Sequence, residues 1–238
     1  AYSLRWYRQM VGISSIGDTT VVTNKWMLGT RNSFFIGICA TLLATALGTV
    51  AALGLSRRNM PFKGTIMAIL ISPMIVPLII TSAGMFFFYS KIGLTHTYLG
   101  LILAHTALGT PFVVITVTAT LTGFDTNLIR ASQSLGADTM RTFFKVIMPL
   151  ILPGVISGGL FAFITSFDEV VVVMFVGSVE QITIPKQMWA GLRQETSPVI
   201  LCMATCLVAL SIALLTTVEM LRRRSERLRG CLLYTSDA

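Results

Sequence analysis

Long apolar stretches, separated by short segments that carry the charges, run through most of this chain of 238 residues. Five long windows contain no Asp, Glu, Lys or Arg, and the first lies between Arg31 and Arg57. The hydrocarbon core of a bilayer is about 30 Å thick and is crossed by about 20 apolar helical residues. Each window is long enough for one crossing. We therefore predict an all-α, polytopic membrane helical bundle with spans at Ser33–Leu55, Thr65–Tyr89, Tyr98–Leu121, Leu150–Val173 and Val199–Leu221.

The composition agrees with a membrane protein and argues against a soluble one. Hydrophobic residues make up 54% of the chain and charged residues 12%, whereas a soluble domain carries about 25% charged residues. The net charge of +8 could suggest nucleic acid. The basic residues, however, lie at the ends of the apolar windows, where they act as topological anchors, so we expect no nucleic-acid partner. The cysteines and histidines show no metal-ligand spacing, and we expect no metal or cofactor.

The distribution of Lys and Arg predicts the orientation of the spans. One alternate set of connecting segments carries eleven of these residues and the other set carries seven. Because cytoplasmic segments are the richer in Lys and Arg, the visible N-terminus is expected outside, with residues 1–32 as a periplasmic segment, and the C-terminus inside. The count by itself indicates a multi-pass membrane protein; a bacterial inner membrane is the location that the resemblance described below implies.

Both ends of the chain have unusual features. An outside N-terminus without a preceding span is hard to deliver, so we expect that a first helix precedes Ala1. Residues 230–238 follow a basic run and continue no helical pattern. They resemble a cloning or sequencing scar or a disordered tail, although a short natural tail is the alternative.

The longest segment on the predicted cytoplasmic side, residues 122–148, has the pattern of two short helices. Asp125 can cap a helix that begins near Thr126, and Gly136-Ala137 ends it. Asp138 can cap a second helix, Thr139–Lys145. The apolar positions of the pair are Leu128, Ile129, Leu135, Met140, Phe143 and Phe144. Such a face fits either a groove on a partner protein or the membrane surface, and the residues alone leave both open.

This segment resembles the EAA loop of binding-protein-dependent ABC permeases. The loop reads E-A-A, three residues, Gly, nine residues, I-x-L-P, and the chain has the same spacing from Arg130 to Pro149. Ala131, Gly136 and Pro149 match the pattern. The departures are Arg130 for Glu, Ser132 for Ala, Val146 for Ile and Met148 for Leu.

The resemblance implies a type I ABC importer transmembrane domain over residues 33–229. In that family this loop lies in a cleft of a cytoplasmic ATPase. The coupling residues that it implies are Arg130, Ala131, Ser132, Leu135, Gly136, Ala137, Phe143, Phe144 and Pro149. A small residue suits the turn because partner side chains approach it closely.

Three further stretches resemble the second permease subunit of the spermidine/putrescine subfamily: Ser3–Tyr7, Ser166–Val170 and Pro185–Trp189. In that subfamily the opening stretch follows a first transmembrane helix. The resemblance implies import of polyamines or of a related small solute such as iron, thiamine or phosphonate. It also implies three partners besides membrane lipid: a cytoplasmic ABC ATPase dimer, a second permease subunit, and a periplasmic or lipid-anchored substrate-binding protein.

Two acids, Asp168 and Glu169, lie close to an apolar window. A charge at the middle of a bilayer costs about 2.5–3.5 kcal/mol. The pair could therefore reach the membrane interface or cap a re-entrant turn. Alternatively, together with Phe167, it could face a substrate path and attract a cation.

No motif for catalysis or nucleotide binding occurs. The chain lacks G-x-x-x-x-G-K-[ST], so its phosphate-binding loop and Lys are absent, and we expect a non-catalytic subunit whose partner hydrolyses ATP. A secondary transporter is the competing class, and it would be expected to contain an inverted repeat and broken helices. Neither is evident in the sequence.

Overall fold

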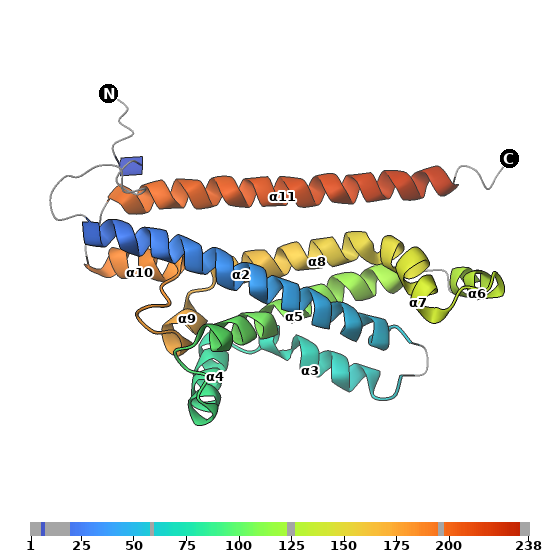
Figure 1. Ribbon diagram of the computed structural model, residues 1–238, viewed down its shortest axis with the longest axis horizontal. Coiled ribbons are helices and arrows are strands. Elements are labelled where there is room, and N and C mark those ends of the chain that lie inside the picture. Colours follow the sequence, from blue (N-terminus) through green and yellow to red (C-terminus); the bar gives the residue numbers. More distant parts are fainter. Residues whose placement is uncertain (1–5, 8–19, 58–59, 123–126, 195–197, 234–238) are drawn as a thin grey trace.

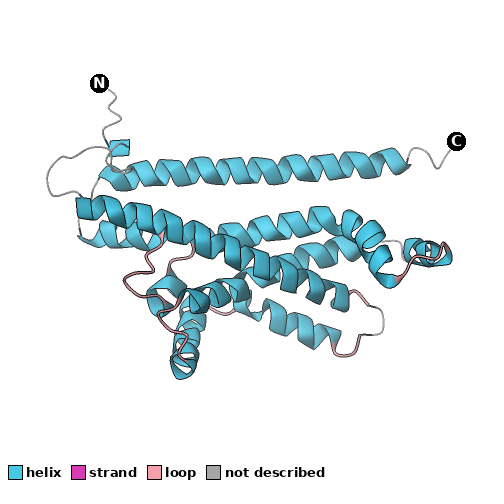
Figure 2. Cartoon of the chain, in the orientation of Figure 1, coloured by secondary structure: helices cyan, strands magenta, loops and turns pink. Residues whose placement is uncertain are grey.

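The computed structural model describes residues 6–7, 20–57, 60–122, 127–194 and 198–233, and every regular element in these ranges is helical (Figures 1 and 2). The prediction of an all-α protein is therefore confirmed. The long helices α2 (Thr20–Leu55), α5 (Tyr98–Thr122), α8 (Met148–Asp168) and α11 (Pro198–Leu233) run along the long axis of the molecule (Figure 1).

Four helical stretches are long and apolar enough to cross a membrane: Lys25–Leu55, Tyr98–Thr122, Thr139–Asp168 and Pro198–Thr217. Three of the predicted spans lie inside or largely inside α2, α5 and α11. The first helix begins at Thr20, well ahead of the predicted Ser33. The charge-free window shows only where the helix is apolar. The helix extends further toward the N-terminus because side chains there also pack against the bundle. Trp26, for example, has an exposed fraction of 4%.

The second predicted span, Thr65–Tyr89, is wrong as a single helix. It is divided into α3 (Lys63–Ile75) and α4 (Leu78–Ile92), which are bent by 103°. Val76 is extended, with φ −71° and ψ 136°, because the ring of Pro77 disfavours the helical conformation in the residue before it. Pro77 also lacks the N–H that would continue the hydrogen-bond ladder. Figure 1 shows α4 turned away from the long axis.

The fourth predicted span, Leu150–Val173, is wrong at its end. Helix α8 stops at Asp168, Glu169 is extended, and a short helix α9 (Val171–Val176) follows. A Glu169 carboxylate oxygen accepts the backbone N–H groups of Val171, at 2.6 Å, and Val172, at 3.0 Å. The acid thus caps the short helix α9.

The start of this span also differs from the prediction. The second short helix was expected to be separate from the span, but α7 (Thr139–Thr142), the π-helical turn η1 (Phe143–Ile147) and α8 form one helix of 30 residues. The Met148 N–H bonds to the Phe143 carbonyl, five residues back. This wider turn brings Pro149, which has no N–H to donate, into the helix without a break.

The core lies where α2, α5 and α8 pack together. Its fully buried side chains include Ala44 and Ala52 from α2, Val113 and Val117 from α5, and Ile151 from α8. Small residues allow the close approach: a Cβ at Gly158 would collide with Thr116 and lie 2.8 Å from the Val113 Cα. The G-x-x-x-G pattern at 154–158 therefore serves a contact inside this chain.

The ends of the bundle differ in what they carry. The connection after α2, the helices α6 (Asn127–Ser134) and α7, and the C-terminal end of α11 lie at one end (Figure 1). The start of α2, α9 and α10 (Ile184–Gln194) lie at the other. This is the same grouping of segments as in the count of Lys and Arg. We call the first the α6 end and the second the α10 end.

Candidate functional site

A short helix pair projects from the α6 end of the bundle, and a glycine sets its shape. Gly136 has φ +81°, a left-handed conformation that glycine adopts without strain. Its N–H bonds to the Gln133 carbonyl at 2.9 Å, and the Ala137 N–H bonds to the Ser132 carbonyl at 3.1 Å. These two bonds make a Schellman motif, which satisfies carbonyls at the end of α6. The predicted break at Gly136-Ala137 is confirmed.

The second helix of the pair begins with the predicted cap. The Asp138 carboxylate accepts the backbone N–H of Arg141 at 2.8 Å. This bond satisfies a free donor in the first turn of α7. The predicted cap of the first helix, Asp125, lies outside the described residues, and α6 is described from Asn127.

One contact between side chains joins the two helices. The hydroxyls of Ser132 and Thr142 are 2.6 Å apart, and Thr142 is almost fully buried. The pair is therefore a defined unit. We call α6, α7 and η1 the projecting unit. The sequence analysis did not find Thr142, because no local pattern shows which residue ten positions away contacts Ser132.

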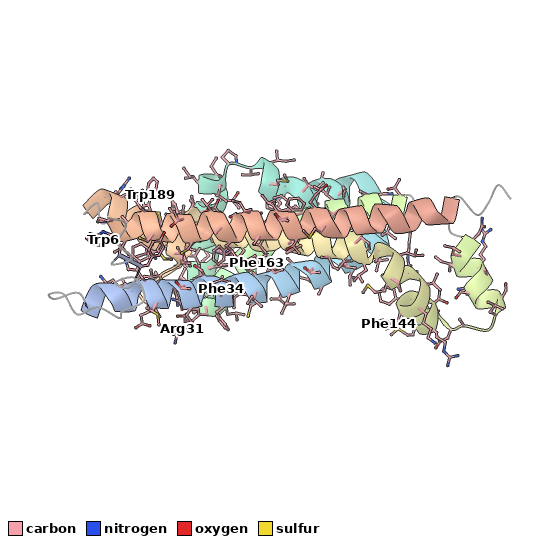
Figure 3. All side chains as sticks on the ribbon, turned by 90° about the horizontal axis from the view of Figure 1, so that it is seen from above. Trp6, Arg31, Phe34, Phe144, Phe163 and Trp189 are labelled. Carbon is pink, nitrogen blue, oxygen red and sulfur yellow. The ribbon has the colours of Figure 1, made fainter. Side chains whose placement is uncertain are left out.

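The projecting unit exposes a large apolar surface. The exposed fractions are 89% for Leu135, 68% for Met140, 61% for Phe144 and 45% for Leu128. Figure 3 shows Phe144 on the outer side of the unit. Of the other predicted coupling residues, Arg130, Ala131 and Pro149 are exposed, while Ser132, Ala137 and Phe143 are half-buried. Apolar surface of this kind at one end of a bundle is typical of a binding face.

A second candidate region lies where the two broken spans meet. A pocket of about 370 Å³ is lined by Leu78, Ile164, Thr165, Asp168, Glu169, Val170 and Val171. Leu78 opens α4 directly after the first break, and Glu169 and Val170 form the second break. Both breaks therefore contribute residues to this one pocket. The sequence analysis named Asp168 and Glu169 but did not find Leu78, because the meeting of the breaks depends on tertiary packing.

The two acids of the pocket differ in their environment. Asp168 is exposed, whereas Glu169 has an exposed fraction of 7% and bonds to the backbone of α9. An exposed carboxylate on a pocket wall can attract a cation. Of the pair, Asp168 therefore has the greater freedom to meet a ligand.

The third residue predicted for the path, Phe167, lies apart from this pocket. Its ring is 5.4 Å from that of Phe163 and 5.1 Å from that of Phe34, measured between centroids. Its exposed fraction is 8%, and it belongs to the cluster around Trp26. Figure 3 shows Phe34 and Phe163 next to each other. The structure thus brings Asp168 and Glu169 together and directs Phe167 into a core.

A polar network at the α10 end was missed by the sequence analysis. The Asn32 amide donates to the carbonyls of Glu180, at 3.1 Å, and Ile182, at 3.0 Å, and its oxygen accepts the Tyr98 hydroxyl at 3.2 Å. The Gln181 amide donates to the His96 carbonyl at 2.7 Å. These bonds fix the loop between α9 and α10 against α2 and the start of α5.

Lys186 adds a charge to this network. Its ammonium donates to the carbonyls of Val173, at 3.2 Å, and Ser178, at 3.0 Å. Burial lowers the pKa of Lys186 below its usual value, because the charged form loses water. The two carbonyls compensate part of that loss and tie α10 to the end of α9.

Within the ranges that the structure describes, no group of three or more His, Cys, Asp or Glu side chains could hold a metal ion. The buried His105 side chain contacts Ser166 through one ring nitrogen only.

Comparison with known proteins places these features in a wider group. The family described as "Binding-protein-dependent transport system inner membrane component" matches residues 12–227. The spermidine/putrescine transport system permease protein PotC of Haemophilus influenzae is 28% identical over 225 residues, which cover 94% of this chain and 84% of PotC. The putrescine transport system permease protein PotI of Escherichia coli K12 is 28% identical over 217 residues, with 87% of this chain and 73% of PotI covered.

Solved structures show the same fold. A chain of an amino acid ABC transporter, crystallised with histidines, superposes with a TM-score of 0.64 at 15% identity and covers 89% of this chain and 100% of its own. A chain of the MetNI methionine ABC transporter in an inward-facing conformation gives a TM-score of 0.59 at 21% identity, with 84% and 92% covered. The expected fold of an ABC importer transmembrane domain is confirmed.

Proposed function

Because this chain belongs to the family of binding-protein-dependent transport system inner membrane components, we propose that it forms the substrate path for polyamines, spermidine or putrescine, or for a related small solute. The family makes it a multi-pass inner-membrane permease subunit that works with an ATPase and a substrate-binding protein. The finer proposal is that the ATPase is a cytoplasmic dimer, that a second permease subunit pairs with this chain, and that the binding protein is periplasmic or lipid-anchored.

The observation that carries the proposal is the projecting unit with its exposed apolar face. Leaving Leu135, Met140 and Phe144 exposed to water is unfavourable by about 25 cal/mol for each Å² of apolar surface that a partner could bury. A groove on a protein partner covers such a face. The spacing shared with the EAA loop and the glycine turn at Gly136 support the cytoplasmic ATPase as that partner.

Helix continuity supports a mechanism for coupling. The helix that begins in α7 continues through η1 and α8 to Asp168 over 30 residues, a length of about 45 Å at 1.5 Å per residue. When ATP closes the two ATPase subunits, the displaced projecting unit would move this helix as a rod. Its far end forms the wall of the pocket at the two breaks. Closure on the cytoplasmic side would thus change the pocket and alternate its access.

Retention of the ATPase by the purified permease tests the coupling proposal. The chain is co-expressed with its ATPase and second permease subunit and purified in detergent through a tag on this chain. Gly136→Trp and Leu135→Asp are expected to abolish retention. Leu192→Asp, at an exposed apolar position on α10, is the matched control and should retain it. Wild-type permease that never retains an ATPase would contradict the proposal.

The pocket at the breaks is our proposed contact for the substrate. Polyamines are polycations, Asp168 is exposed on the pocket wall, and the relatives named above are polyamine permeases. Asp168→Asn is expected to reduce uptake of radiolabelled spermidine at saturating binding protein. Thr165→Val, on the same wall, is the control for pocket shape. Uptake that is unchanged in both Asp168→Asn and Glu169→Gln would remove the acids from the path.

Orientation is proposed on the same basis, with the α6 end cytoplasmic and the α10 end periplasmic. In a variant without native cysteines, Ser134→Cys should react with a membrane-impermeant maleimide only in inside-out vesicles. Reaction in intact spheroplasts would place the projecting unit outside and exclude contact with a cytoplasmic ATPase.

The two broken spans favour one other candidate, a secondary transporter, since such proteins bind ions at broken helices. Transport by proteoliposomes separates the classes. The proposed importer requires ATP and binding protein, whereas a secondary transporter would work with an ion gradient alone.

A further inference from the structure

The charged side chains of the projecting unit are mostly of one sign, and the structure leaves them uncovered. Within residues 127–147 the cations are Arg130, Arg141 and Lys145, and the acid is Asp138. The three cations are exposed. None of them forms an ion pair with any residue in the described part of the chain.

The acid of the unit is already engaged. The Asp138 carboxylate accepts the Arg141 backbone N–H and caps α7. In the described part of the chain it forms no ion pair with the three cations. The exposed side chains of the unit are therefore mainly apolar and cationic.

The contact with α7 determines where Arg130 points. Ser132 faces Thr142, and Arg130 precedes Ser132 by two residues on the same helix. Two residues turn an α-helix by about 200°, so Arg130 lies on the side of α6 opposite the contact. Its side chain is exposed and starts from the face of α6 turned away from α7, where a partner can reach it.

We infer that the groove which receives α6 on the cytoplasmic ATPase is acidic, with a carboxylate facing Arg130; this inference rests on the proposed function. A guanidinium binds a carboxylate through two parallel hydrogen bonds, and Arg suits such a contact better than Lys. The apolar residues supply contact area, whereas the charge selects the partner and accelerates the encounter.

The Arg at position 130, where the EAA pattern has Glu, should affect which ATPase this chain can bind. The pattern has Glu where this chain has Arg130. A groove that suits a carboxylate would repel a guanidinium, and repulsion between like charges is an effective way to reject a wrong partner. The ATPase of this chain should therefore differ in charge at this point from an ATPase that receives a Glu.

Charge reversal with the intact complex tests the inference. The tagged chain, co-expressed with its ATPase and second permease subunit, is purified at low and at high salt, and the retained ATPase is quantified. Arg130→Glu should reduce retention at low salt by about tenfold, and Arg130→Gln by less. Arg193→Glu, an exposed arginine at the α10 end, is the matched control and should change nothing.

A second arm identifies the facing residue. A photo-cross-linking amino acid at position 130 should label an ATPase segment that contains Asp or Glu. Changing that acid to Arg should restore retention by the Arg130→Glu permease. A labelled segment without acids, or a reversed pair that stays separated, would overturn the inference.

The outcomes distinguish this inference from the proposed function. If Arg130→Glu retains the ATPase like the wild type while Leu135→Asp loses it, the acidic groove is wrong and coupling stands. If neither variant alters retention, the coupling role falls as well. If Arg130→Glu instead changes only the dependence of transport on anionic lipid in proteoliposomes, Arg130 serves the membrane surface, and the inference is again wrong.

Discussion

The Nδ1 atom of His105 lies 2.7 Å from the Ser166 hydroxyl oxygen, in a buried site between α5 and α8. Ser166 precedes the break at Glu169 by three residues. The contact therefore joins the end of α8, where the pocket begins, to the central helix of the bundle. A polar contact inside a membrane protein contributes about 0.6 kcal/mol on average and up to about 1.7 kcal/mol.

Removing one partner of this contact should cost more than removing both. Ser166→Ala leaves a buried ring nitrogen without a partner, and we expect a loss of about 1 kcal/mol in the free energy of unfolding. The double variant His105→Leu with Ser166→Ala should recover part of the loss, because no buried polar group is then left unpaired. Thermal unfolding in detergent measures both, with Thr216→Ala on α11 as control. Equal losses for the single and double variants would contradict this account.

The turn at Gly136 should tolerate Asn and reject Val. At φ +81° a side chain costs about 1–2 kcal/mol, while Asn is among the residues that adopt this region most readily. Beyond its chain neighbours, no atom of the described chain lies within 4 Å of a Cβ at Gly136, so within this chain the substitution causes backbone strain and no collision, and Asn and Val, similar in size, differ mainly in that strain. We expect ATPase activity stimulated by binding protein to persist in Gly136→Asn and to fall severalfold in Gly136→Val. Equal activity in the two would show that the turn need not keep its shape.

Packing between α5 and α8 should be lost when Gly158 gains one methyl group. Its Cβ would meet the Thr116 hydroxyl and the Val113 backbone, and overpacking of this kind costs about 1–3 kcal/mol. We expect Gly158→Ala to lower the melting temperature in detergent. Gly84→Ala on α4 is the control and should leave it unchanged, because the added Cβ would have no described atom within 4 Å apart from its chain neighbours and its own helix backbone. A stable Gly158→Ala would mean that the helices separate without cost.

The loop between α9 and α10 should loosen when Asn32 is replaced. Asn32→Ala removes two bonds to the carbonyls of Glu180 and Ile182 and the acceptor for Tyr98. Hydrogen exchange should become faster in residues 178–184, where the Ile184 N–H bonds to the Ser33 hydroxyl. Asn32→Asp keeps the acceptor for Tyr98 but places a second acceptor oxygen against the two carbonyls in a buried site, so it should loosen the loop at least as much as Asn32→Ala. If hydrogen exchange in residues 178–184 does not change, packing against α10 and not Asn32 holds the loop in place.

Sequence reasoning found the projecting unit because its shape depends on local chemistry. Gly136 sets a left-handed turn and Asp138 caps the helix that follows, and both act on backbone groups within three residues. The Ser132–Thr142 contact was out of reach, since its geometry depends on how two helices cross. Likewise, the apolar window predicted one span over Thr65–Tyr89 and did not show that α4 would turn by 103°.

The sequence by itself determined the number and rough position of the apolar segments. Charged side chains are excluded from lipid, so each segment is visible as a long window without charges. The sequence also determined the motif at Gly136, because a few neighbouring residues fix a turn. Only the tertiary structure decided that the breaks at Pro77 and Glu169 share one pocket and that Phe167 lies in a core. It alone placed Asn32 against a loop about 150 positions later. Such contacts join distant segments through packing, which local pattern does not specify.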